Sequence, residues 1–151
     1  MNTSEPLKRY TRWHGLVMAT GIAANMLFVL GLFFVPGVLL SLLHIPPDYS
    51  IWVRFSANLL FLLSVFYIPA IWDLQRYRAN AWFAVFPSRI FGTVFFTVAV
   101  FCFDQPAGFL VFAGDLIFAL AQGYLLIQVT REEKKLGLNI GMRSWEAAKN
   151  A

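Results

Sequence analysis

Asp115 is a carboxylate inside an apolar run, and it poses the main chemical question of this sequence. The run PAGFLVFAGDLIFALAQGYLLIQV contains no lysine or arginine that would neutralise it. An ionised carboxylate in apolar surroundings is costly unless a cation or several hydrogen-bond donors pair with it. A partner for Asp115 therefore has to come from another part of the chain, where it serves either structure or function.

The string around Asp115, AGDLIF, resembles one string in each of three other apolar runs: AANMLF, SANLLF and FGTVFF. Each has a small residue, then a polar one, two apolar ones and a phenylalanine. The polar members are Asn25, Asn58, Thr93 and Asp115. At a rise of about 1.5 Å per residue, all four are expected within roughly 5 Å of the bilayer centre. Polar groups in hydrocarbon need partners, so we expect these four to face one another.

Two arginines extend this polar cluster. Arg89 precedes Thr93 by four residues, and Arg54 precedes Asn58 by four, so each shares a helix face with its polar neighbour. Arg89 is expected deep in the membrane and is the predicted partner of Asp115, with Arg54 as the second choice. Gln122, seven residues beyond Asp115, adds a secondary polar group on the same face.

The predicted ion pair has three interpretations. It is a structural pair, the polar part of a site for a lipophilic ligand, or a station on a proton path. A proton path across the bilayer needs more polar stations than these residues supply, which makes transport the weaker functional option.

Other chemistry finds little support in the sequence. The two histidines, His14 and His44, fall near opposite membrane faces, and Cys102 is the single cysteine. These residues give no haem or metal ligand set. No serine stands in a nucleophile elbow and no glycine-rich phosphate loop follows a strand. The sequence therefore favours a protein that is not an enzyme and has no metal or fixed cofactor, although a quinone or a lipid fits the polar cluster.

Composition indicates the surroundings in which these residues act. Of the 151 residues, 59% are hydrophobic and 13% are charged, whereas soluble domains carry about 25% charged residues. The excess of apolar residues predicts an integral membrane protein whose partner is the lipid bilayer. A net charge of +4 does not indicate nucleic acid binding, because the basic residues stand at the ends of apolar segments.

Four apolar segments reach the roughly 20 residues that a membrane-spanning helix requires. They are expected near 14–35, 51–71, 81–103 and 107–129. The predicted fold is an all-α, four-transmembrane-helix bundle of up-down-up-down order within residues 1–130. A polar C-terminal tail is predicted for 131–151. The segment VPGVLLSLLHIPP, after the first span, is expected at the membrane surface.

The basic residues predict the orientation. The N-terminal segment, the link between spans two and three, and the tail hold ten of the twelve lysines and arginines, and the opposite loops hold none. The positive-inside rule then places both termini in the cytoplasm.

Two stretches resemble the DoxX-like group of small four-helix bacterial membrane proteins. LFFVPGVLLSLLHIPP is similar to the proline-broken end of that group's first helix. WVRFSANLLFLLSVFYIPAIWDLQRYRANAWFAVFPSRIFGTVFF is similar to its helix-two arginine, its inner loop and its helix-three R-x-x-G. The resemblance implies a bacterial inner-membrane protein. Some members are associated with quinone-linked sulfur oxidation or redox complexes, but the group offers no catalytic set to carry over.

Two functional hypotheses follow. The first is a non-catalytic subunit or accessory protein that packs against other membrane subunits, or against copies of itself, for example in an electron-transfer assembly. The second is a DoxX-like protein that binds a quinone or similar lipophilic ligand at the polar cluster. A packed interior favours the first hypothesis, and a pocket reaching Asp115 favours the second.

Overall fold

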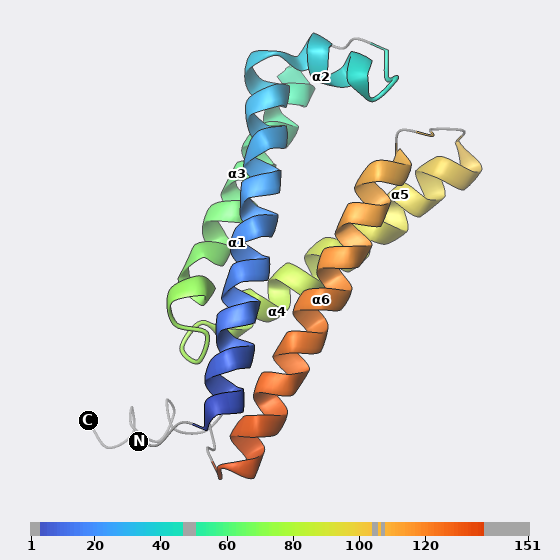
Figure 1. The fold of residues 1–151 in the computed structure, drawn as a ribbon. Helices are drawn as coiled ribbons and strands as arrows, with labels where there is room; N and C mark the ends of the chain where they lie inside the picture. Colours follow the sequence, from blue (N-terminus) through green and yellow to red (C-terminus); the bar gives the residue numbers. More distant parts are fainter. Residues whose placement is uncertain (1–3, 47–50, 104–105, 107, 138–151) are drawn as a thin grey trace.

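The computed structural model describes residues 4–46, 51–103, 106 and 108–137, and is helical with no strand in those ranges (Figure 1). Four helical segments are long and apolar enough to cross a membrane: Glu5–Phe34, Ile51–Trp72, Arg78–Cys102 and Gly108–Lys135. The chain is therefore a multi-pass integral membrane protein built as a four-helix bundle, as the sequence predicts.

The first span is α1 (Glu5–Phe34), which Pro6 opens in its first turn, where a missing N–H does no harm. It ends at Phe34, and after Val35 the short helix α2 (Pro36–Leu42) begins. Figure 1 shows α2 turned away from the α1 axis at one end of the molecule. The second span, α3 (Ile51–Trp72), contains Pro69 near its end.

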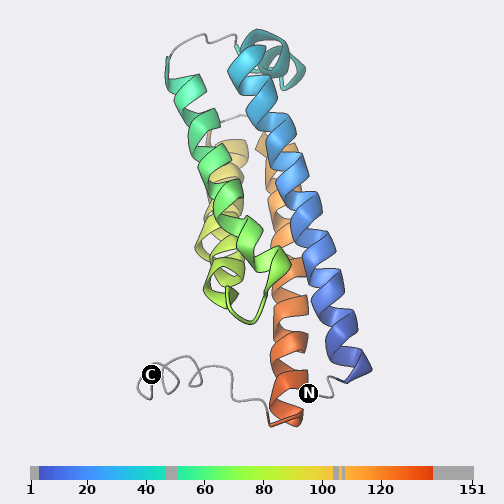
Figure 2. The same cartoon turned by 90° about the vertical axis from the view of Figure 1, so that its left-hand side faces the viewer.

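The helices form two antiparallel pairs, α1 with α3 and α5 (Ile90–Cys102) with α6 (Gly108–Lys135). Contacts between α1 and α6 join the two pairs. Figure 1 shows the pairs diverging toward the end that carries α2. The start of α1 and the end of α6 lie together at the opposite end (Figure 2).

The tightest packing lies toward the end where α1 begins. Small residues such as Ala70, Ala81 and Ala84 are almost fully buried there. Small side chains let membrane helices approach closely. By contrast, α5 has no buried residue. Burial within the chain is thus greatest toward the start of α1 and least along α5.

The third span is interrupted, whereas the sequence predicted one continuous helix over 81–103. It consists of α4 (Arg78–Phe83), a π-helical segment η1 (Ala84–Arg89) and α5. Phe86 within η1 has extended backbone angles, φ −131° and ψ 125°. Pro87 follows and has no N–H to give to the helical ladder, which explains the break at this point.

Two helices extend beyond the membrane spans predicted for them. α1 begins at Glu5 rather than near residue 14, and α6 continues to Lys135 rather than ending near 129. Both extensions bury a side chain, Leu7 on α1 and Glu133 on α6, so packing rather than hydropathy sets these ends. The predicted polar tail therefore begins with helical residues, and 138–151 lie outside the described ranges.

Candidate functional site

An ion pair between Arg89 and Asp115 lies where the broken third span meets α6. Arg89 Nη1 donates a hydrogen bond to Asp115 Oδ1 at 2.7 Å. The Arg89 side chain is 7% exposed and that of Asp115 is 22% exposed. This is the pairing expected from the axial spacing of the two residues. Each charge neutralises the other in surroundings where neither has ready access to water.

Two glycines make room for this pair. A Cβ atom added to Gly21 of α1 would lie 2.7 Å from Arg89 Nη2, and one added to Gly92 of α5 would lie 2.5 Å from Asp115 Oδ2. Both distances are too short for a real side chain. The guanidinium and the carboxylate therefore occupy the space that side chains at these two positions would fill.

Aromatic side chains complete the surroundings of Arg89. Its Cζ atom lies 4.7 Å from the centroid of the Phe118 ring, within the range of a cation–π contact. Tyr67 of α3 is close enough to both Arg89 and Asp115 to interact with them electrostatically. The pair thus connects α6, the broken span and, through Tyr67, the α1–α3 pair.

The other predicted cluster residues divide into two groups. Asn25 Nδ2 donates to Ser64 Oγ at 3.1 Å, which links α1 to α3. Thr93 Oγ1 donates to the Arg89 carbonyl oxygen at 2.8 Å, one turn back on its own helix. Gln122 is 1% exposed. These three residues lie inside the bundle near the pair or further along α6.

Asn58 and Arg54 do not join them, which corrects the expectation that all four polar residues meet at one depth. Both side chains are exposed on α3. The register of α1 against α3 gives the reason, because Asn25 lies opposite Ser64. Asn58 precedes Ser64 by six residues, which places it about 9 Å nearer the start of α3.

A cleft opens between α3 and the break in the third span, and neither Arg89 nor Asp115 lines it, so it is not the predicted pocket reaching Asp115. Its volume is about 340 Å³, and it is lined by Leu63, Phe66, Tyr67, Phe83, Pro87 and Ser88. Three of these, Leu63, Phe66 and Phe83, are at least 43% exposed, so the cleft opens sideways at the bundle surface. Its wall is apolar except for two hydroxyl-bearing side chains.

One of those hydroxyls is deeply buried. Tyr67 is 3% exposed, and its hydroxyl lies close to that of Ser88, but makes no hydrogen bond of good geometry to any residue that the structure describes. Buried tyrosine hydroxyls usually find a partner. Arg89 Nε is likewise buried and without a partner within the described part of the chain. The cleft thus carries two neighbouring hydroxyls, and Arg89 follows one of them, Ser88, in the chain.

Sequence reasoning missed the cleft and a second ion pair. Arg78 Nη2 donates to both carboxylate oxygens of Glu133 at 2.5 Å, and Glu133 is 2% exposed. Pro87 inside a predicted span was a usable signal for the break. No local pattern marked Tyr67, Ser64 or Glu133, because their roles depend on which helices meet.

No known family, curated protein or solved structure matches the chain. The DoxX-like resemblance therefore stays a prediction, and the function has to be argued from the site itself.

Proposed function

We propose that this integral membrane protein binds a lipophilic small molecule with a neutral, hydrogen-bond-accepting head, such as a quinone, in the cleft at Tyr67. The observation that carries the proposal is the neighbouring hydroxyls of Tyr67 and Ser88, which lie in the wall of an otherwise apolar cleft that is open to the side. Ligand sites of this kind are mostly apolar with a few placed polar groups.

The lining suits a ring with carbonyl oxygens. Phe66 and Phe83 offer aromatic faces, while the Tyr67 and Ser88 hydroxyls can donate to carbonyl oxygens. A long apolar tail would leave through the exposed side at Leu63 and enter the lipid. Arg89 and Asp115 neutralise each other behind the cleft, so they favour a neutral head over a charged one.

We also propose that the protein lies in a bacterial inner membrane, with the start of α1 and the end of α6 on the cytoplasmic side. Eight described lysines and arginines lie at that end, in the first turns of α1, the link after α3 and the last turns of α6. The positive-inside rule supports this side as the cytoplasmic one.

Binding is tested with purified protein and a short-chain ubiquinone. The ligand retained after size exclusion is measured by absorbance across a concentration series. Tyr67→Phe removes one hydrogen-bond donor without changing shape and should weaken binding by roughly fivefold. Tyr124→Phe, at an exposed tyrosine of α6, is the matched control and should bind like the parent. Equal affinity of the two variants, or no saturable binding by the parent, contradicts the proposal.

A second candidate function, a subunit packing against another membrane chain, is favoured by α5. This helix buries none of its residues within its own chain. A photo-reactive residue placed at Phe95, 66% exposed on α5, should crosslink to one stoichiometric partner in membranes. The same group at Tyr124 on α6 serves as the control. Crosslinks to lipid alone from both positions would leave the subunit hypothesis without support.

A further inference from the structure

A groove lies between α1 and the end of α3, at the cation-bearing end of the bundle. Its volume is about 580 Å³. The side chains that matter for its chemistry are Lys8, Arg12, Gly15 and Ala19 from α1, and Ile71 and Trp72 from α3. It shares no lining residue with the Tyr67 cleft, so it is a separate site.

The groove changes character along its length. Lys8 and Arg12 are one helical turn apart and share a face, which continues through Leu16 toward Ala19. Gly15 lies close to α3, since a Cβ added there would be at ordinary contact distance, 3.8 Å, from the Ile71 carbonyl oxygen. The cations therefore lie at the end of the groove nearer the start of α1, and an apolar slot leads from them toward the membrane interior.

The cations at the outer end are largely free to bind an anion. Lys8 Nζ lies 4.0 Å from Glu5 Oε1, and both side chains are highly exposed, so this contact is weak. Arg12 belongs to no ion pair in the described ranges. Asp73 also lines the groove, but its Oδ1 accepts the backbone N–H of Arg76.

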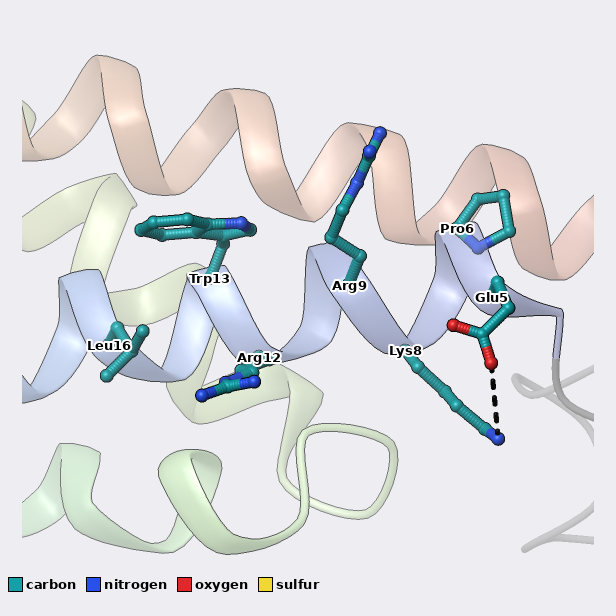
Figure 3. Close-up of a pocket in the computed structure, with 7 residues that line it drawn as sticks. All are labelled: Glu5, Pro6, Lys8, Arg9, Arg12, Trp13 and Leu16. Atoms are coloured by element: carbon teal, nitrogen blue, oxygen red, sulfur yellow. Dashed lines mark ion pairs between the residues drawn. The ribbon is translucent and has the colours of Figure 1, made fainter.

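The same cations border a second hollow on the neighbouring side of α1. It has a volume of about 610 Å³ and adds Arg9 and Trp13 to Lys8 and Arg12. Figure 3 shows Arg9 and Trp13 projecting to one side of the helix and Lys8 and Arg12 to the other. Trp13 and Trp72 are 55% and 82% exposed, as aromatic residues at a membrane interface are.

We infer that the groove binds an anionic phospholipid. The phosphate lies between Lys8 and Arg12, and an acyl chain runs along Gly15, Ala19 and Ile71. Basic pockets between membrane helices on the cytoplasmic side recognise acidic head groups in this way. A soluble phosphate would use the cations alone, whereas the groove continues as an apolar slot that only a lipid chain fills.

The test uses the full chain in nanodiscs of equal parts phosphatidylglycerol and phosphatidylcholine with matched acyl chains. Native mass spectrometry counts the lipids that stay bound after release. Two cations at about fivefold each predict a preference for phosphatidylglycerol of about twenty-five-fold. Lys8→Gln with Arg12→Gln should remove that preference, and each single change should reduce it about fivefold.

Three comparisons make the result decisive. Arg131→Gln with Lys134→Gln removes the same charge from exposed positions at the end of α6 and should leave the preference intact. Ala19→Trp keeps both cations but fills the slot, and should abolish retention of the lipid. Inorganic phosphate should not displace the bound lipid. Equal retention of the two lipids, an equal loss in the α6 variant, retention after Ala19→Trp, or displacement by phosphate overturns the inference.

Discussion

Two ion pairs tie the interrupted third span to α6, and they stand in different surroundings. Arg89–Asp115 lies within the apolar parts of both helices, after the break. Arg78–Glu133 lies at the first residue of α4 and in the last turn of α6. In the central pair neither charge is near an end of the bundle. In the terminal pair, Arg78 is 22% exposed and Glu133 only 2%.

The comparison shows that the two pairs should respond differently to the loss of one partner. A long arginine at the end of a membrane helix can extend its head to water, and a buried carboxylate cannot. The terminal pair should therefore be asymmetric, with one harmful and one tolerable deletion. The central pair should be harmed by the loss of either residue, because a charge left there has no route to solvent.

The largest expected effect tests the central pair. Arg89→Leu or Asp115→Asn should each lower the free energy of unfolding in mild detergent by about 3–5 kcal/mol, the range for breaking a buried pair. The double variant Arg89→Leu with Asp115→Leu removes both charges and should recover part of that loss. Thermal unfolding followed by circular dichroism measures all three. Single variants as stable as the parent would mean that the pair does not hold the bundle.

The next effect tests the asymmetry of the terminal pair. Arg78→Met leaves the buried Glu133 carboxylate without its partner and should lower the free energy of unfolding by about 2–3 kcal/mol. Glu133→Gln leaves Arg78 able to reach water and should lower it by about 1 kcal/mol or less. The same unfolding measurement compares them. Equal losses would show that both ends of this pair are held equally far from solvent.

The smallest effect is expected from a substitution that adds a methyl group beside the central pair and leaves every charge in place. Gly92→Ala puts a methyl group where the Asp115 carboxylate lies, and should lower the free energy of unfolding by about 1–3 kcal/mol. Gly114→Ala is the matched control, since an added Cβ there meets nothing within 4 Å. Alanine suits a helix better than glycine by about 1 kcal/mol, so the control should be neutral or stabilising. Two equally tolerated substitutions would argue against close packing around Asp115.

The two pairs also show which contacts can be predicted from the sequence alone and which cannot. Hydropathy and helical rise were enough to find four spans and to pair Arg89 with Asp115, because the short turn before α6 fixes the register of its neighbour. Asn58 was misplaced because α1 and α3 are joined through a longer connection, and their register depends on packing. Glu133 was assigned to a polar tail because hydropathy cannot show that a charged residue is buried by a partner 55 residues away.

The Tyr67 cleft was beyond prediction for a related reason. It exists because the third span breaks at Phe86 and leaves a space against α3. Pro87 signals that a break is possible, but the shape of the space depends on the backbone angles after the break. Neither Tyr67 nor Ser88 stands in a motif that would single it out.

The unequal lengths of the helices determine how much of the bilayer each one can cross. At about 1.5 Å per residue, α1 and α6 measure about 45 and 42 Å, and α3 about 33 Å. The hydrocarbon core of a bilayer is about 30 Å thick. Figure 2 shows α1 and α6 continuing past the turn that follows α3. With its head-group layers a bilayer is about 40–45 Å thick. α1 and α6 are therefore long enough to cross the head-group layers as well, including the one in which Lys8 and Arg12 are proposed to bind a phosphate, whereas α3 crosses little more than the hydrocarbon core.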